Sequence, residues 1–228
     1  MKQQTSPAIV LRRTNYAEAD RIVTFLTPIG KVRAIVKGVR RSKSKLAGGI
    51  ELFSESTITF LETRGNLSRV ISTRLEQHWD GIVGDLQRMM FGYEAMKLLD
   101  KVVEDDTEAE RGYYDLLKNT LQALGELTIP QTAVEVWFYA RLLKLQGREP
   151  NLSTDLAGKK LEGELLYTFS TEDMCFAISS HGDFRPDHIK LLRLVMAHKI
   201  DVLKQIKNVA ELSQQLSVLL KQVAMQQT

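Results

Sequence analysis

The stretch RIVTFLTPIGKVRAIVK, residues 21–37, has the pattern of two strands joined by a tight turn. Residues 21–27 are rich in the β-branched and apolar side chains that strands favour. Pro28 fixes its own φ, and Gly30 can adopt the positive φ of a type II turn. In residues 31–37 the alternation of side chains predicts a strand with two different faces. One face would carry Val32, Ala34 and Val36, and the other Lys31, Arg33, Ile35 and Lys37.

Three further segments of the first third have the same character. Residues 8–14, 55–63 and 67–76 are short and rich in apolar and β-branched side chains, and the Arg-Gly-Asn triplet at 64–66 predicts a hairpin turn between the last two. Five short strands with tight turns within about eighty residues are typical of a small closed or nearly closed β-barrel.

After Trp79 the apolar residues recur at spacings of three and four, which is the pattern of helices. Helices are expected over residues 82–103, 113–127, 130–147, 186–200 and 208–227. The first would have an apolar face of Ile82, Leu86, Met89, Met90, Tyr93, Met96 and Leu99. We expect an acidic loop at 104–112 and irregular structure at 149–170. The predicted fold class is α+β, with a five-stranded barrel in residues 1–80 and an all-α helical domain in residues 81–228.

Composition excludes several classes of protein. The chain has 228 residues, of which 43% are hydrophobic and 26% charged, as in ordinary globular proteins. No apolar run approaches the roughly 18–20 residues that a membrane helix needs, so no membrane partner is expected. Arg12 and Arg13 interrupt the first apolar run before it could form a signal peptide. Cys175 is the single cysteine, which rules out an internal disulfide and fits a cytoplasmic location.

The net charge of +3 hides an uneven distribution. Residues 1–80 hold 14 Lys or Arg against 7 Asp or Glu, whereas residues 81–228 hold 17 against 21. A basic first third joined to a mildly acidic remainder indicates two units with different partners.

The basic residues concentrate after the second predicted turn. Residues 31–45 carry seven cations and no acid: Lys31, Arg33, Lys37, Arg40, Arg41, Lys43 and Lys45. They could contact nucleic-acid phosphates, or they could be a solvated strand and loop whose charges protect an exposed edge. Gly38, Gly48 and Gly49 fit a mobile loop that orders on DNA. Tyr16, in a polar turn, is the best candidate for stacking on a base. Both interpretations of the cations remain open from charge alone.

Catalytic motifs are missing from the sequence. His78, His181, His188 and His198 are scattered, and no Walker loop, Ser-His-Asp set or glycine-rich nucleotide fingerprint occurs. Glu18 and Asp20 are expected to fix the turn before the second strand rather than to act in catalysis. We therefore expect no enzyme, and a nuclease is disfavoured because there is no carboxylate cluster or metal motif.

Three stretches together resemble one family, the bacterial DNA repair protein RecO. They are AIVLRRTNYAEADRIVTFLTPIGKVRAIVKGVRRSKSKL at 8–46, ELFSESTITF at 51–60 and VWFYARLLKLQGREPNL at 136–152. The resemblance implies an N-terminal OB-fold, a helical C-terminal domain and a recombination mediator without turnover. It implies binding of single- and double-stranded DNA, annealing of complementary strands and help in loading RecA. The implied protein partners are RecR and the C-terminal tail of the single-stranded DNA-binding protein, with RecF and RecA as indirect partners.

The sequence departs from this family at its zinc site. Many members hold zinc with two Cys-x-x-Cys pairs, which by alignment would fall at Thr154 and Ala157 and near Ile178 and His181. None of these is cysteine, and Cys175 is out of register. A structural zinc site needs four closely placed ligands. We therefore expect a degenerate, cysteine-free version of this region around residues 150–184, with no metal and no cofactor.

A partner's acidic tail with apolar terminal residues needs an apolar groove flanked by cations. Residues 130–147 and their exit offer Arg141, Lys144 and Arg148 at helical spacing, beside Leu142, Leu143 and Leu145. The alternative is an ordinary polar helix face. At the level of the whole protein, the alternative to a DNA-binding mediator is a protein–protein adaptor whose barrel is a scaffold with no direct DNA role.

Overall fold

The computed structural model describes the chain except for residues 1, 64–66, 104–110, 162, 164 and 227–228. The chain forms two compact units, Met1–Gly125 and Glu126–Thr228. The change from strands to helices occurs near residue 80, where we expected a domain boundary, but the first three helices pack in the same unit as the strands.

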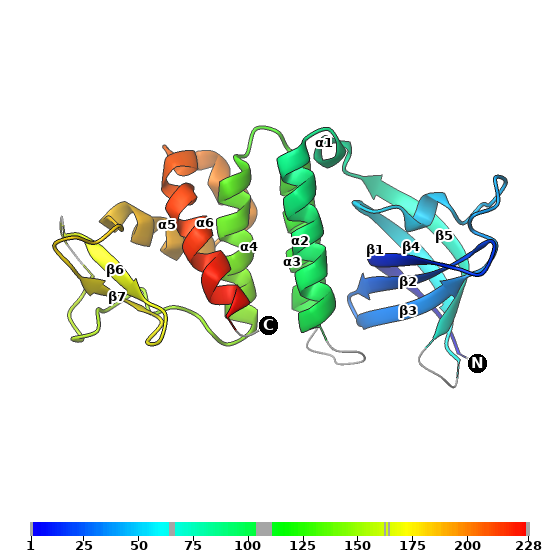
Figure 1. The fold of residues 1–228 in the computed structure, drawn as a ribbon, viewed down its shortest axis with the longest axis horizontal. Helices are drawn as coiled ribbons and strands as arrows, with labels where there is room; N and C mark the ends of the chain where they lie inside the picture. The colour runs from blue at the N-terminus through cyan, green and yellow to red at the C-terminus, as the bar shows by residue number, and fades with distance from the viewer. Residues whose placement is uncertain (1, 64–66, 104–110, 162, 164, 227–228) are drawn as a thin grey trace. The chain divides into compact units, whose positions relative to one another are not determined.

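Five strands of the first unit close into a barrel in the order β1-β2-β3-β5-β4 (Figure 1). They are β1 (Gln3–Tyr16), β2 (Asp20–Thr27), β3 (Gly30–Val36), β4 (Ser54–Leu61) and β5 (Ser68–His78). β3 and β5 pair in parallel, and the other neighbours are antiparallel. A five-stranded barrel with this order is an OB-fold, which confirms the predicted architecture. The turn predicted at 64–66 lies outside the described residues.

The inside of the barrel is filled by the residues that strand alternation predicts. Ala34 and Val36 of β3 are fully buried, while Arg33, which precedes Ala34, is exposed. Phe25 of β2 and Phe60 of β4 supply the largest side chains. Burying each such side chain contributes about 1.5–3 kcal/mol, so the apolar face of each strand fixes its register.

Helices α1 (Asp80–Val83), α2 (Leu86–Val102) and α3 (Arg111–Gly125) complete the first unit. The helix predicted from residue 82 is divided because the Asp85 carboxylate accepts hydrogen bonds from the N–H groups of Gln87 and Arg88 and starts a new helix there. We expected an acidic loop at 104–112. Residues 104–110 of it lie outside the described residues, and residues 111–112 form the start of α3.

The predicted apolar face of α2 is wrong in part. Leu86, Met90 and Tyr93 are 62%, 57% and 45% exposed. The buried face instead includes Gly92, where a Cβ atom would lie 2.7 Å from the ring of Phe53. The close approach of α2 to Phe53 needs a residue without a Cβ atom. The helix is therefore oriented with Gly92 toward Phe53.

The third helix is fixed to the barrel by a buried carboxylate. Glu55 of β4 is 7% exposed and accepts hydrogen bonds from the Tyr114 hydroxyl at 2.5 Å and the Lys118 ammonium at 2.8 Å. Burial, and then the hydrogen bond to Glu55, raise the pKa of Tyr114 far above its usual value. The hydroxyl therefore remains a donor, and α3 stays attached to the barrel.

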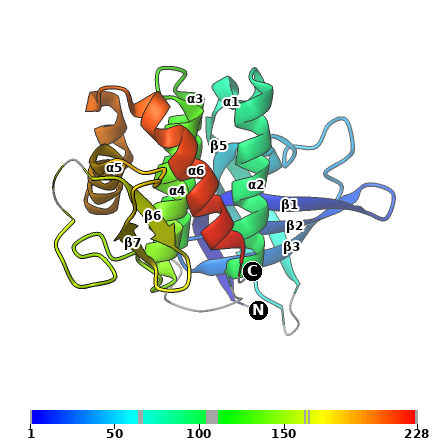
Figure 2. The ribbon, with the colours of Figure 1, turned by 60° about the vertical axis from the view of Figure 1, so that its left-hand side comes forward.

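The second unit is built around α4 (Gln131–Leu145), which is buried on most sides and packs against α5 (Pro186–Ala197) and α6 (Val209–Met225) (Figure 2). Residues 150–184 contain a hairpin of β6 (Tyr167–Ser170) and β7 (Cys175–Ile178), which the sequence pattern did not predict. The expectation of an all-α second domain is corrected by this hairpin. Phe176 is fully buried there, with its ring centroid 5.0 Å from that of Phe169 and 5.6 Å from that of Phe184.

Candidate nucleic-acid interface

The basic segment, residues 37–45, is anchored at both ends. Val39 inserts into the barrel core and is 3% exposed, and Ile50 beyond the segment is fully buried. Between them, backbone hydrogen bonds from Arg41 N–H to the Gly38 carbonyl and from Ser44 N–H to the Arg41 carbonyl form successive turns. The segment is therefore a set of hydrogen-bonded turns held against the barrel.

Two of the three glycines that predicted a mobile loop, Gly38 and Gly49, have local structural roles. Gly38 has a φ of 63°, which favours glycine. At Gly49 a Cβ atom would lie 2.3 Å from the Cβ of Thr73, whose hydroxyl also donates to the Leu46 carbonyl at 3.2 Å. The absence of a side chain at Gly49 lets the return of the segment lie close to β5.

The basic segment lies beside the β1–β2 turn (Figures 1 and 2). Asp20 accepts a hydrogen bond from the Gly38 N–H at 2.7 Å, and the Arg40 N–H donates to the Ala19 carbonyl at 2.9 Å. The Arg40 guanidinium donates to the Ala17 carbonyl at 3.4 Å. Tyr16, 51% exposed, is therefore at the same end of the barrel as the cations. Asp20, expected to fix the turn before β2, is seen to hold the start of the basic segment through Gly38.

Several cations elsewhere on the barrel are paired with carboxylates, unlike those of residues 33–45. Arg12, Arg13 and Arg74 form ion pairs with Asp100, Glu51 and Glu76. Within the described part of the chain, the exposed cations that have no carboxylate partner include Arg33, Lys37, Arg40, Arg41, Lys43 and Lys45. A cation with no carboxylate beside it can meet a phosphate without first giving up an ion pair.

Lys31 is separated from this group by its contacts. Its ammonium donates to the carbonyl oxygens of Asp100 and Val103 at 3.0 and 2.8 Å and lies 3.9 Å from the Asp100 carboxylate. A lysine at the carbonyl end of a helix is favoured by the helix dipole. Lys31 therefore attaches α2 to the barrel, and we leave it out of the proposed interface.

The cations predicted to receive a partner's tail are mostly bound within their own unit. Arg141 donates to the carbonyls of Met196 and His198 at 2.7 and 3.0 Å, and its guanidinium lies 5.5 Å from the centre of the Trp137 ring. Arg148 donates to the Val223 carbonyl at 3.3 Å, and Lys144 lies 3.4 Å from Glu149. Arg141 and Arg148 thus hold the ends of α5 and α6 rather than flanking an open groove.

A different groove of the second unit combines apolar and basic side chains. It has a volume of about 390 Å³ and lies between α5 and the start of α6. Its lining includes Leu191, Leu194, Ile206 and Leu212 with Arg185, Lys190 and Lys207. Arg185 and Lys190 pair with Glu211 and Asp187. Sequence reasoning missed this groove because its cations come from separate helices and a connecting segment.

Residues 150–184, where the family's zinc site would fall, are stabilised by hydrogen bonds among their own residues. The Asp155 carboxylate accepts hydrogen bonds from the N–H groups of Ala157 and Lys159, and Thr154 accepts one from the side chain of Asn151. Burial raises the pKa of the Cys175 thiol, and thiolate is the form that binds metals. No cluster of three or more potential metal ligands occurs among the described residues. The described donors of this region therefore do not make up the four-ligand set of a structural zinc site.

None of the helices in the described ranges has the length and apolar character of a membrane-spanning segment.

In the comparison with known proteins, two family models match consecutive parts of the chain. The family model "Recombination protein O N terminal" matches residues 1–78, and "Recombination protein O C terminal" matches residues 83–224. A DNA repair protein RecO of Roseiflexus is 39% identical over 118 residues, which are 52% of this chain and 41% of that protein. One from Moorella thermoacetica is 34% identical over 68% of this chain and 57% of its own length.

One from Alkaliphilus metalliredigens is 26% identical over 95% of this chain and 90% of its own length. In the first two comparisons, by contrast, the chain spans about half the length of the curated relative.

Proposed function

The chain belongs to the recombination protein O family, and on that premise we propose that it is a mediator of DNA repair and recombination. It binds single- and double-stranded DNA without sequence specificity and anneals complementary strands. It also helps to load RecA onto DNA coated by the single-stranded DNA-binding protein, and it acts without enzymatic turnover in the cytoplasm. RecR is its direct partner in this role, and RecF and RecA are indirect ones.

The proposal of DNA binding rests on the exposed cations of β3 and the basic segment, which have no carboxylate partner among the described residues. Phosphate contacts carry no sequence information by themselves, so this set supports binding that ignores sequence. Tyr16 beside it offers one ring on which an unpaired base can stack. Annealing follows from the same charges, because cations that neutralise two phosphate backbones at once reduce the repulsion between the strands.

DNA titrations at several salt concentrations test this function. We expect affinity to fall steeply between about 50 and 200 mM salt, with a log–log slope of about −0.9 for each duplex phosphate contacted. Mixing complementary strands coated with the single-stranded DNA-binding protein should show faster annealing when the protein is present. Absence of DNA binding at the lowest salt would favour the adaptor interpretation, in which the barrel is only a scaffold.

For the acidic tail of the single-stranded DNA-binding protein we propose the α5–α6 groove, because it joins an apolar floor to cations. Within the described residues Lys207 has no carboxylate partner. Lys144, by contrast, faces Glu149 on an exposed surface. Lys207→Glu is therefore expected to weaken tail-peptide binding about tenfold, since it puts a carboxylate beside an acidic ligand.

Lys144→Glu is the matched control, with the same change of charge in the same unit, and it should leave the affinity within about twofold. Fluorescence anisotropy with a labelled tail peptide measures both. If Lys144→Glu weakens binding and Lys207→Glu does not, the receptor lies at the helix α4 exit and this placement is wrong.

A further inference from the structure

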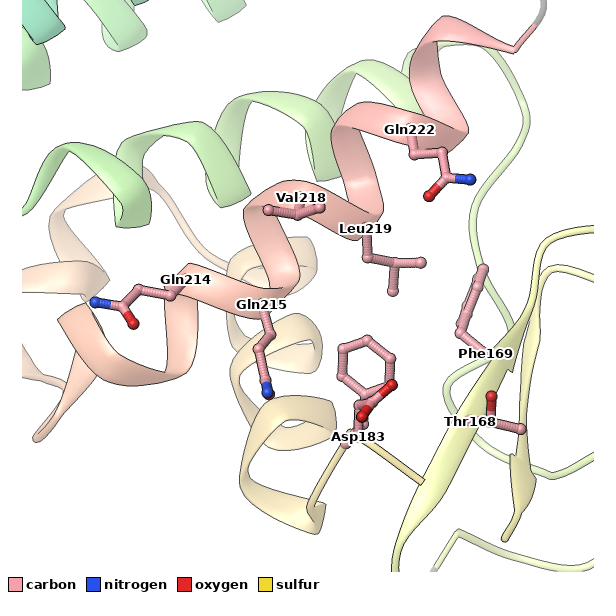
Figure 3. A pocket seen from close by; sticks show the side chains of 9 residues that line it. Thr168, Phe169, Asp183, Gln214, Gln215, Val218, Leu219 and Gln222 are labelled. Carbon is pink, nitrogen blue, oxygen red and sulfur yellow. The ribbon is translucent and has the colours of Figure 1, made fainter. Parts of the chain in front are cut away.

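The second unit has another groove, the β6–α6 groove, which differs in charge from the one above. It has a volume of about 540 Å³ and lies between the β6–β7 hairpin and α6. Figure 3 shows Gln215, Leu219 and Gln222 of α6 on one side, with Phe169 and Asp183 opposite them. Its floor is apolar, and Val218 at its border is 67% exposed. The groove therefore offers apolar surface framed by amides.

One wall of the groove is the outer edge of β6. The N–H and carbonyl of Tyr167 both bond to Phe184, at 2.8 and 3.0 Å, so they point away from β7. Polar groups alternate in direction along an antiparallel strand, so those of Thr168 point to β7 and those of Phe169 point back to the groove side. Among the described residues the Phe169 main chain has no backbone partner on that side. Such an edge can pair with another extended chain.

The charge of the β6–α6 groove indicates which class of ligand it would bind. Asp183 is exposed and, within the described part of the chain, its carboxylate has neither an ion pair nor a hydrogen bond. The lining includes no Lys or Arg. A nucleic acid or an acidic peptide would therefore bring negative charge to an uncompensated carboxylate, which is unfavourable. A cationic side chain is the complement of this site.

We propose that the β6–α6 groove binds an extended, basic peptide segment of a partner protein. The peptide main chain pairs with Phe169 on the free edge of β6, as in strand addition. An apolar side chain of the peptide enters between Phe169, Phe184 and Leu219, and a neighbouring Lys or Arg reaches Asp183. The side-chain amides of Gln215 and Gln222 can both donate to and accept from the peptide backbone. This site is independent of the proposed DNA interface and of the acidic-tail groove.

The probe is a short fluorescein-labelled peptide that alternates valine with lysine, titrated into the full chain and followed by anisotropy. We expect Asp183→Asn to weaken binding about fivefold, as for loss of a partly exposed ion pair. Glu172→Gln, which removes a carboxylate from the turn of the same hairpin, is the matched control and should bind as the unsubstituted protein does. A peptide with an N-methyl group at its central residue should bind about tenfold more weakly, because it lacks a main-chain donor.

The following results would overturn the proposal. They are absence of binding at millimolar peptide, equal affinity in Asp183→Asn, equal affinity of the N-methylated peptide, and tighter binding when glutamate replaces lysine in the probe. Loss of peptide binding as the protein concentration rises would assign the groove to a second copy of the chain and would overturn it as well. Unchanged melting temperatures of the variants exclude misfolding as the cause of weaker binding.

Discussion

Replacing Lys37, Arg41, Lys43 and Lys45 together by glutamine is expected to remove most of the DNA affinity. All four side chains are exposed, and none has a carboxylate partner among the described residues. Each phosphate contact contributes on the order of tenfold in affinity at about 0.1 M salt, and its loss makes the salt slope shallower by about one. The measurement is a titration of labelled single-stranded and duplex DNA at several salt concentrations.

A matched pair of double variants separates position from net charge. Lys43→Gln with Lys45→Gln removes two cations from the basic segment, and Lys97→Gln with Lys101→Gln removes two exposed lysines from α2 in the same unit. We expect the first pair to weaken DNA binding roughly 10- to 100-fold and the second to change it by less than threefold. Equal losses from the two pairs would show that DNA senses only the overall charge of the unit, and the proposed interface would be wrong.

The variants should fold normally, which makes the result interpretable. The segment is attached through Val39, Gly49 and the hydrogen bond between Asp20 and Gly38, none of which is changed. Exposed substitutions that break no contact usually alter stability by less than about 0.5 kcal/mol. A fall of several degrees in melting temperature would mean that the cations also support the fold.

The barrel and its basic segment were predictable from sequence because their signals are local. Alternation within β3 separates Ala34 and Val36 from Arg33 over a few residues, and the absence of acids in residues 31–45 is visible directly. The role of Lys31 was not predictable, since its carbonyl partners are 69 and 72 residues away in sequence. Charge alone cannot distinguish a cation that binds a helix end from one that faces solvent.

The same limit applies to the second unit. Arg141 meets carbonyls 55 and 57 residues away, and Arg148 one that is 75 residues away. The hairpin was missed because β6 and β7 have four residues each, too few for a periodic signal. What holds them is a cluster of rings from separate segments, which becomes visible only after folding.

Replacing Phe176, which belongs to this cluster of rings, is expected to have the largest effect on stability. Phe176 is fully buried, and its ring contacts those of Tyr167, Phe169 and Phe184 edge to face, with centroid distances of 6.4, 5.0 and 5.6 Å. Phe176→Ala would leave a cavity that the short hairpin cannot close, at an expected cost of about 3–5 kcal/mol in the free energy of unfolding. Tyr16→Ala, which removes an exposed ring, is the control and should cost less than about 0.5 kcal/mol.

Denaturant unfolding, followed by a probe in the second unit, measures the cost of Phe176→Ala. A zinc chelator distinguishes the physical origin of this stability. If rings and the turn around Asp155 hold residues 150–184 together, chelation should leave the melting temperature of the unsubstituted protein unchanged, whereas structural zinc contributes directly to folding energy. A large drop with the chelator, together with a small effect of Phe176→Ala, would mean that a metal stabilises this region and that the aromatic cluster is secondary.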